Sequence, residues 1–125
     1  MNLTILSDTF AICRLGPAED VPDWAMIGEF VSITHTGDEL SIVCAEEHVP
    51  PDVKADREWR VLKVEGPLDL ALTGVLASLA NPLAEAQLNI FAVSTFDTDY
   101  LLVKGYNLPR ACDVLRQAGF IVNEI

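Results

Sequence analysis

Short apolar runs separated by polar, turn-like segments fill the first half of the chain. Leu3–Leu6 and Phe10–Leu15 predict two strands, and Phe30–Thr34 and Leu40–Cys44 predict two more. The last two runs flank His35–Asp38, whose residues are typical of a hairpin turn, so we expect these strands to pair antiparallel. The first half is therefore predicted to be mostly β.

The connections in this half carry prolines and charges instead of an apolar stripe. Residues 16–23, GPAEDVPD, predict a loop, followed by at most one helical turn around Trp24–Met26. The stretch at residues 52–58 is mainly charged, so we place a domain boundary there, between residues 1–56 and residues 57–125.

Helical periodicity first occurs in the second half. After a predicted strand at Trp59–Val64, apolar residues recur at intervals of three and four, as on one face of a helix: Leu72, Val75, Leu76, Leu79 and Leu83. Thr73 lies close to the expected start of this helix and is a candidate cap. Pro82 should kink or restart the helix, because proline has no backbone N–H.

A second hairpin and a second helix complete the pattern. Asn89–Thr95 and Asp99–Lys104 predict paired strands, a helix should run from near Asn107 to Gly119, and Phe120–Ile125 predicts a last strand. The second half thus has the order βαββαβ. This order predicts an α+β, ferredoxin-like fold, with two helices on one face of a four-stranded antiparallel sheet.

The two halves resemble each other in sequence. At an offset of 60 residues, Ser32–Val43 aligns with Ala92–Val103, strand with strand and turn with turn, and Glu39 falls on Asp99. The same offset places Met1–Leu6 over Val61–Gly66. We therefore predict that the first half is a reduced copy of the second, with its first helix shrunk to one turn.

The net charge limits the kinds of binding partner, and the cysteine content bears on the cellular compartment. With 8 basic and 19 acidic residues, the formal charge of −11 repels phosphate backbones and anionic headgroups, so we expect neither nucleic acid nor membrane as a partner. No apolar run approaches the roughly 20 residues of a membrane helix, and the first residues lack the basic region of a secretion signal. We predict a cytoplasmic protein whose Cys13, Cys44 and Cys112 are reduced core thiols.

Known catalytic and cofactor signatures do not occur in the sequence. It contains no GxSxG, GxxxxGK, HExxH or paired CxxC motif. His48 beside Glu46 and Glu47 indicates a solvated acidic turn, because neighbouring positions rarely converge on one metal ion. His35 is expected to be a turn residue. We predict no catalytic residue, no metal and no cofactor.

Two polar patches interrupt the otherwise apolar stretch Gly66–Val103, namely TG at Thr73-Gly74 and STFDTD at Ser94–Asp99. With these patches, the run LTGVLASLANPLAEAQLNIFAVSTFDTDYLLV resembles the ACT domain, a regulatory module that binds amino acids. More narrowly, it is similar to the ACT repeats of the cytosolic arginine sensors called CASTOR and their small bacterial relatives. The resemblance covers Trp59–Ile125 well and residues 1–56 more loosely, as a degenerate ACT unit in tandem.

The resemblance implies a ligand site at the face between two ACT units. By the family pattern, Thr95, Phe96 and Asp99 correspond to ligand-contacting positions of the STFxTD run, and Gly74 and Val75 to those of the helix entry. The arginine sensors have an acidic residue where this chain has Leu72. The resemblance therefore does not extend to arginine as the ligand.

The chemistry of these residues suits a free amino acid. Asp97 and Asp99 can accept hydrogen bonds from an ammonium group, and the N–H groups that begin the Thr73 helix suit a carboxylate, which Gly74 lets approach closely. The apolar wall of Leu72, Val75 and Phe96 predicts a neutral or apolar ligand side chain. The candidate ligand-binding residues are Leu72, Thr73, Gly74, Val75, Ser94, Thr95, Phe96, Asp97 and Asp99.

Structural roles compete with each of these assignments. The two aspartates are also typical turn formers, Thr73 is a candidate cap, Gly74 can allow close packing and Phe96 can form a dimer contact. Two function classes follow. The first is an amino-acid-binding regulatory module without catalytic activity, homodimeric because exposed sheet edges favour pairing, that acts on an unknown protein partner. The second is a ligand-free structural module that regulates a partner by direct contact.

Overall fold

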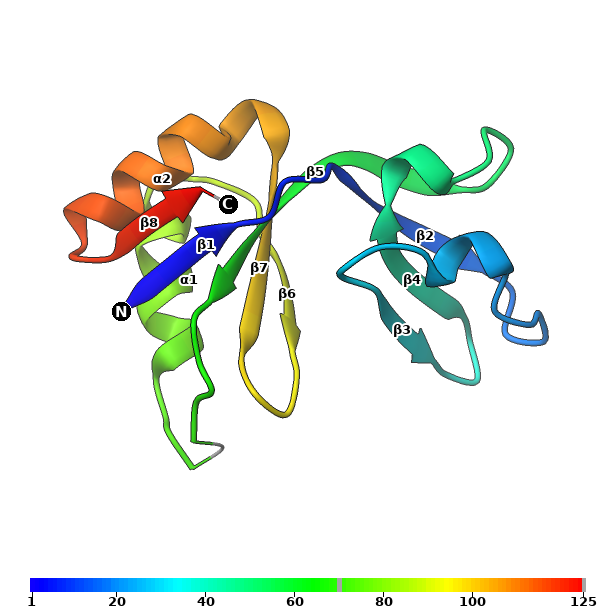
Figure 1. Cartoon of the computed structure of the whole chain (residues 1–125), viewed down its shortest axis with the longest axis horizontal. Helices are drawn as coiled ribbons and strands as arrows, with labels where there is room; N and C mark the ends of the chain where they lie inside the picture. Colours follow the sequence, from blue (N-terminus) through cyan, green and yellow to red (C-terminus); the bar gives the residue numbers. More distant parts are fainter. Residues whose placement is uncertain (70, 125) are drawn as a thin grey trace. The chain divides into compact units, whose positions relative to one another are not determined.

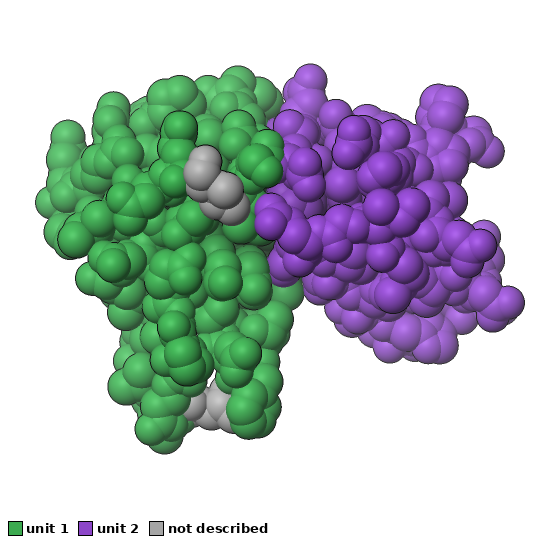
Figure 2. Space-filling view, viewed as in Figure 1, with its two compact units in different colours: residues 1–7, 60–125 green, residues 8–59 purple. Residues whose placement is uncertain are grey.

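The chain forms two compact units in the computed structural model, which describes residues 1–69 and 71–124 (Figure 1, Figure 2). The first unit is Asp8–Trp59, and the second unit combines Met1–Ser7 with Arg60–Ile125. Strand β5 (Ala55–Val64) begins in the first unit and ends in the second. No helix in the described part of the chain is long and apolar enough to cross a membrane.

The second unit is a sheet whose one face is covered by two helices (Figure 1). Its sheet has the order β6-β7-β5-β1-β8. Besides β5, its elements are β1 (Asn2–Ile5), α1 (Val75–Glu85), β6 (Phe91–Ser94), β7 (Asp99–Lys104), the 3₁₀ turn η3 (Gly105–Asn107), α2 (Leu108–Gln117) and β8 (Ile121–Glu124). The predicted βαββαβ succession from β5 onward is confirmed.

The predicted four-stranded antiparallel sheet is wrong in one respect, because β1 is inserted as a fifth strand. It pairs antiparallel with β5, Leu3 opposite Val64, and parallel with β8, Leu3 opposite Val122. Leu3 and Ile5 are buried in the core beneath the helices. Because those side chains complete this core, the N-terminal strand belongs to the second unit and is not the start of the first.

Both helices bury the apolar residues that their spacing places on one face. The core of the second unit contains Leu79 and Leu83 of α1 and Ala111, Cys112 and Leu115 of α2. Helix α2 ends before Gly119, whose φ of 99° is favourable for a residue without a Cβ, as predicted.

The start of α1 differs from the prediction. The helix begins at Val75, and the residue before it is Gly74, with a left-handed φ of 78° and no side-chain capping bond. The predicted cap at Thr73 is therefore wrong, and Leu72 precedes the helix. Pro82 lies inside α1, which continues to Glu85. The glycine turns the chain sharply into the helix, and this geometry leaves Thr73 outside the capping position.

The first unit repeats the succession of strands from β5 to β8 along the chain, without the helices and without a counterpart of β1. Its sheet order is β3-β4-β2-β5. The elements are β2 (Phe10–Leu15), the 3₁₀ turn η1 (Asp23–Met26), β3 (Ser32–His35), β4 (Leu40–Ala45), the 3₁₀ turn η2 (Glu46–His48) and the first half of β5. The reduced copy therefore runs from β2 to β5, with a 3₁₀ turn in the place of each helix.

Hairpin registers correct the predicted offset between the two halves. His35 pairs with Leu40 in one hairpin and Ser94 with Asp99 in the other, and Ser94 follows His35 by 59 residues. The threonine after each of these residues donates its backbone N–H to the carbonyl oxygen three residues later. Glu39 consequently corresponds to Thr98, and its predicted match with Asp99 is wrong by one residue.

Strand β5 runs through the charged stretch at which the domain boundary was predicted. A bulge accommodates it, because Phe10 pairs with Trp59 while Ile12 pairs with Asp56. Glu58 takes a left-handed φ of 69° there, and its N–H donates to Glu46 Oε1 at 2.7 Å. Charged residues thus fit in the strand by pointing outward or by leaving the ladder.

All three cysteines are buried and free, as predicted. Cys13 and Cys44 lie in the core of the first unit and Cys112 in that of the second. Burial raises the pKa of the Cys112 thiol, which favours its unreactive protonated form.

Candidate functional site

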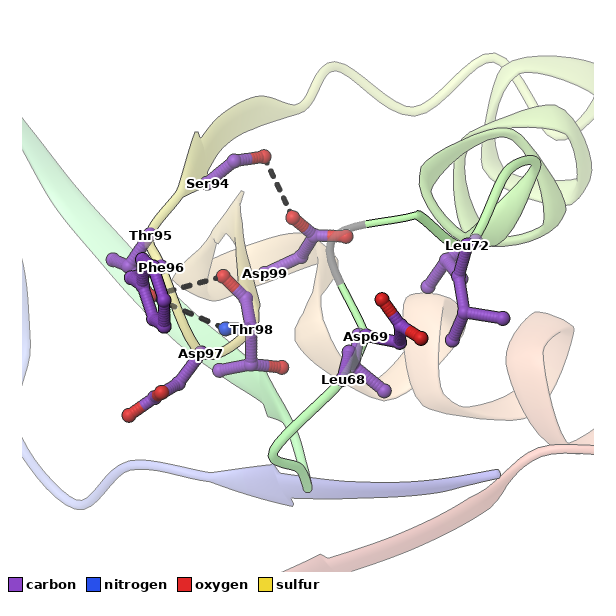
Figure 3. A pocket seen from close by; sticks show the side chains of 10 residues that line it. Leu68, Asp69, Leu72, Ser94, Thr95, Phe96, Asp97, Thr98 and Asp99 are labelled. Carbon is purple, nitrogen blue, oxygen red and sulfur yellow. Dashed lines mark hydrogen bonds between the residues drawn. The ribbon is translucent and has the colours of Figure 1, made fainter.

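A cleft of about 210 Å³ opens in the second unit between the segment that leads into α1 and the β6–β7 turn (Figure 3). Its lining residues come from these two segments and from the ends of the adjoining elements: Leu68, Asp69, Leu72, Val75, Ser94, Thr95, Phe96, Asp97, Thr98 and Asp99. The sheet pairing of β7 with β5 brings the two segments together, because the α1 segment continues directly from β5.

Threonine side chains hold the β6–β7 turn in shape. Thr95 donates its backbone N–H to the Thr98 carbonyl oxygen at 2.8 Å, and the Thr95 hydroxyl accepts the Thr98 N–H at 3.3 Å. The Thr98 hydroxyl, on a residue only 5% exposed, donates to the Val64 carbonyl oxygen at 2.6 Å. This last bond anchors the turn to β5 and leaves Phe96 and Asp97 at its tip.

The segment before α1 is fastened to the same turn. Leu68 donates its N–H to the Asp97 carbonyl oxygen at 2.6 Å. A Cβ added at Gly66 would lie 2.9 Å from the Leu68 nitrogen and 3.1 Å from the Asp97 oxygen, so this close approach requires glycine. Asp69 Oδ1 accepts the Ala71 N–H at 2.9 Å, which gives this carboxylate a structural role as well.

The charges of the cleft are all negative. Asp69, Asp97 and Asp99 contribute carboxylates, and the lining residues include no lysine, arginine or histidine. Ser94 Oγ donates to Asp99 Oδ1 at 2.6 Å, which fixes the orientation of that carboxylate. In Figure 3 the Asp69 and Asp99 carboxylates lie toward Leu72, whereas the Asp97 carboxylate points away from both.

Apolar side chains form the other wall. Leu68 and Val75 are half-buried, and Leu72 is 55% exposed. Phe96, at the tip of the turn, is 79% exposed. A ligand in this cleft would therefore meet the Asp99 carboxylate on the strand side, and the Asp69 carboxylate together with aliphatic carbon on the helix side.

Most of the predicted site residues lie together in the cleft. These are Leu72, Val75, Ser94, Thr95, Phe96, Asp97 and Asp99. Thr73 and Gly74 do not line it, although Gly74 sets the direction in which α1 begins. Sequence reasoning missed Leu68, Asp69 and Thr98. Thr98 lies inside the STFDTD run, so the motif itself could have indicated it, whereas Leu68 and Asp69 belong to a loop without periodicity.

Fold and sequence comparisons agree on the class of domain. The strand order and the two helices define a ferredoxin-like domain, and a family model described as the ACT domain matches residues 54–117. The chain belongs to the ACT-domain family. A second family model, described as an N-terminal domain, matches residues 8–52.

Individual relatives add detail. The chain is 29% identical over 109 residues to the cytosolic arginine sensor for mTORC1 subunit 1 of Bos taurus, a match that covers 73% of this chain and 33% of the sensor. It therefore spans about a third of the length of that curated relative.

Two solved structures resemble the whole chain. A protein from Agrobacterium tumefaciens is 43% identical, with a TM-score of 0.94 and coverage of 99% of this chain and 92% of that one. The regulatory subunit of aspartate kinase from Thermus thermophilus has a TM-score of 0.60 at 12% identity, covering 90% of this chain and 93% of that one, which shows a shared fold alone.

Proposed function

We propose that this protein is a non-catalytic, cytoplasmic regulatory module that binds one free amino acid in the cleft between the α1 entry and the β6–β7 turn. The observation that carries the proposal is the composition of that cleft, with an oriented carboxylate, a helix start and an aliphatic wall within about 210 Å³. This volume is below the roughly 300–1,000 Å³ of clefts for drug-sized ligands, so it suits a small metabolite. Kinship with an amino-acid sensor supports the same class of ligand.

Asp99 is the group that receives the ligand ammonium in this proposal. Its Oδ1 is already held by Ser94 Oγ at 2.6 Å, so the carboxylate is oriented before the ligand arrives. A charge-assisted hydrogen bond to an ammonium is shorter and stronger than a neutral one. Orientation by Ser94 reduces the entropy that binding must cost.

The start of α1 receives the ligand carboxylate. Gly74 provides no side-chain cap, and Val75, the first helical residue, lines the cleft. The N–H groups of a first helical turn lack intrahelical partners, and the helix dipole favours a negative charge there. Leu68, Leu72 and Val75 then contact the ligand side chain, which favours a neutral or apolar amino acid.

A second ACT unit is proposed to cover the open side of the cleft in a homodimer. Leu72 and Phe96 flank the cleft and are 55% and 79% exposed, which is unfavourable for large apolar side chains in water. A ligand held by both subunits would favour the dimer by mass action and so change the surface offered to a protein partner.

Thermal unfolding of the purified protein with each common amino acid tests the proposal. We expect one neutral or apolar amino acid to stabilise the protein by about 2.7 kcal/mol at a hundredfold excess over its dissociation constant. Asp99→Asn and Ser94→Ala should abolish that gain. Asp38→Asn, an equal change of charge at the tip of the other hairpin, should retain it.

The possible outcomes separate the parts of the proposal. Absence of any amino-acid effect on a folded protein would refute ligand binding and favour the ligand-free structural module. A response to arginine alone would refute the apolar selectivity while retaining the site. Sedimentation equilibrium with and without the effective amino acid tests the homodimer, since ligand should increase the dimer fraction.

A further inference from the structure

A second cavity, of about 310 Å³, lies on the other face of the sheet in the second unit. It shares the turn residues Thr95, Asp97 and Thr98 with the first cleft, but its other walls are different. Lys63 and Tyr100 line it. The sequence neighbours of Lys63 face the core beneath the helices, and those of Tyr100 face that core on one side and the first cleft on the other. Since side chains alternate along a strand, these two point to the face opposite the helices.

Lys63 is the cation of this cavity. It is half-buried and forms no ion pair with any residue of 1–69 or 71–124. A charge removed even partly from water costs free energy unless an opposite charge compensates it. The position is therefore suited to the carboxylate of a ligand.

Two carboxylates share the cavity with Lys63. Glu65 follows the end of β5, and Asp97 lies at the tip of the turn; both are exposed. The Asp97 carboxylate points away from Asp69 and Asp99 of the first cleft (Figure 3). Its main-chain oxygen is fixed by the Leu68 N–H at 2.6 Å, which holds the turn that carries it. Asp97 is thus better placed for the second cavity than for the first.

We propose that this cavity is a second ligand site, specific for a small zwitterion with one carboxylate and one ammonium group. The carboxylate lies at Lys63, the ammonium lies at Asp97 and Glu65, and the rings of Pro67 and Tyr100 contact the carbon skeleton. A simple anion would meet two carboxylates here and a simple cation would meet Lys63, so only a ligand with both charges satisfies the lining. This proposal does not rest on the proposed function of the first cleft, although the two cavities share Thr95, Asp97 and Thr98.

Backbone NMR of this 125-residue chain distinguishes the two sites. Each common amino acid is titrated, and the expected result is a group of shifting amides at Lys63, Glu65 and Tyr100, separate from a group at Val75, Ser94 and Asp99. Lys63→Met should weaken the first group's response at least about tenfold, equal to 1.4 kcal/mol, and leave the second group unchanged. Asp99→Asn should do the reverse. The spectrum of each variant reports whether it is folded, and Lys63→Gln is the substitute if Lys63→Met is not.

Analogues of the effective amino acid test the zwitterion requirement. The amine without the carboxylate and the acid without the amine should each bind the Lys63 cavity at least about tenfold more weakly. The proposal is overturned if no amino acid shifts the Lys63 and Tyr100 amides, if the shifts survive loss of Lys63, or if the acid alone binds equally well. Shifts at Lys63 without shifts at Ser94 would refute only the proposed function of the first cleft.

Discussion

Apart from the inserted β1, the two units have the same succession of strands along the chain, but they differ in what connects these strands. In the first unit the connections are η1, of 4 residues, and η2, of 3 residues, whereas in the second they include α1, of 11 residues, and α2, of 10 residues. The hairpin turns themselves are alike, since Thr36 and Thr95 each donate an N–H across the turn, at 2.9 and 2.8 Å. A cleft also lies beside the first unit's turn, lined by Pro17, Ala18, His35, Thr36 and Gly37. The segment opposite the turn therefore decides which groups line the cleft and not whether a cleft exists.

What faces each turn shows the difference directly. In the first unit His35 Nε2 lies 2.8 Å from the Pro17 carbonyl oxygen, so a loop is hydrogen-bonded beside the turn. In the second unit Leu72 and Val75 face the turn across the cleft. Reduction of the helices thus removes the helix N-terminus and the aliphatic wall together, and with them the features that suit an amino acid.

Truncation of a buried leucine should have the largest effect on stability. It should also show whether the two units unfold separately. Leu115 in α2 and Leu40 in β4 are 0% and 2% exposed. We expect Leu115→Ala and Leu40→Ala each to lower the free energy of unfolding of its own unit by about 2–5 kcal/mol. Trp24 and Trp59 both lie in the first unit and both α-helices in the second, so fluorescence and far-UV circular dichroism report on different units during urea unfolding.

Separate stability of the two units is contradicted if the fluorescence and circular dichroism unfolding curves coincide in both variants. In that case the chain unfolds as one cooperative unit despite its two cores. Divergence of the two curves, with each variant moving mainly its own probe, would establish that the helical and helix-free units are separately stable.

Removal of the hydrogen bond that anchors the β6–β7 turn should lower stability by a smaller amount. The equivalent change in the other hairpin should not have this effect. Thr98→Val removes the hydroxyl that donates to the Val64 carbonyl oxygen at 2.6 Å, and with it the bond that ties the turn to β5. The expected loss of stability is about 0.5–1.5 kcal/mol. Glu39→Ala, at the equivalent turn position, should change stability by less than about 0.5 kcal/mol. Thermal unfolding of both variants checks this, and equal losses would contradict the assignment of Thr98 as an anchor.

The sequence predicted the local elements well because their signals are local. Helix α2 follows from apolar spacing and Gly119, and both hairpins follow from paired apolar runs. The insertion of β1 could not be predicted in this way, because Leu3 pairs with Val64 and Val122, and alternation indicates a strand without indicating its neighbours.

The candidate site was predictable only where a motif marked it. The STFDTD run and its resemblance to the ACT family indicated Ser94, Thr95 and Asp99, which line the cleft. Leu68 enters through a main-chain bond to Asp97, an interaction that leaves no residue-type signal. The Thr73 cap was wrong for a related reason, since the left-handed Gly74 fixes where α1 begins.

The ends of the two helices allow the smallest and most closely matched test. Both end in the same motif, in which Leu88 donates to the Leu83 oxygen and Phe120 to the Leu115 oxygen, each at 3.0 Å. The residue that takes positive φ is Gly119 after α2, at 99°, but Gln87 after α1, at 61°. A side chain is unfavourable there because its Cβ crowds the backbone.

We expect Gln87→Gly to stabilise the protein and Gly119→Ala to destabilise it, each by about 1 kcal/mol or less. A Cβ at Gly119 would meet no atom within 4 Å, so the loss at that position measures backbone strain without a packing clash. Chemical unfolding followed by circular dichroism gives both values on the same helical signal. If Gly119→Ala stabilised the protein, positive φ would not be unfavourable for a side chain at these helix ends. The strain assigned to Gln87 would then be contradicted as well.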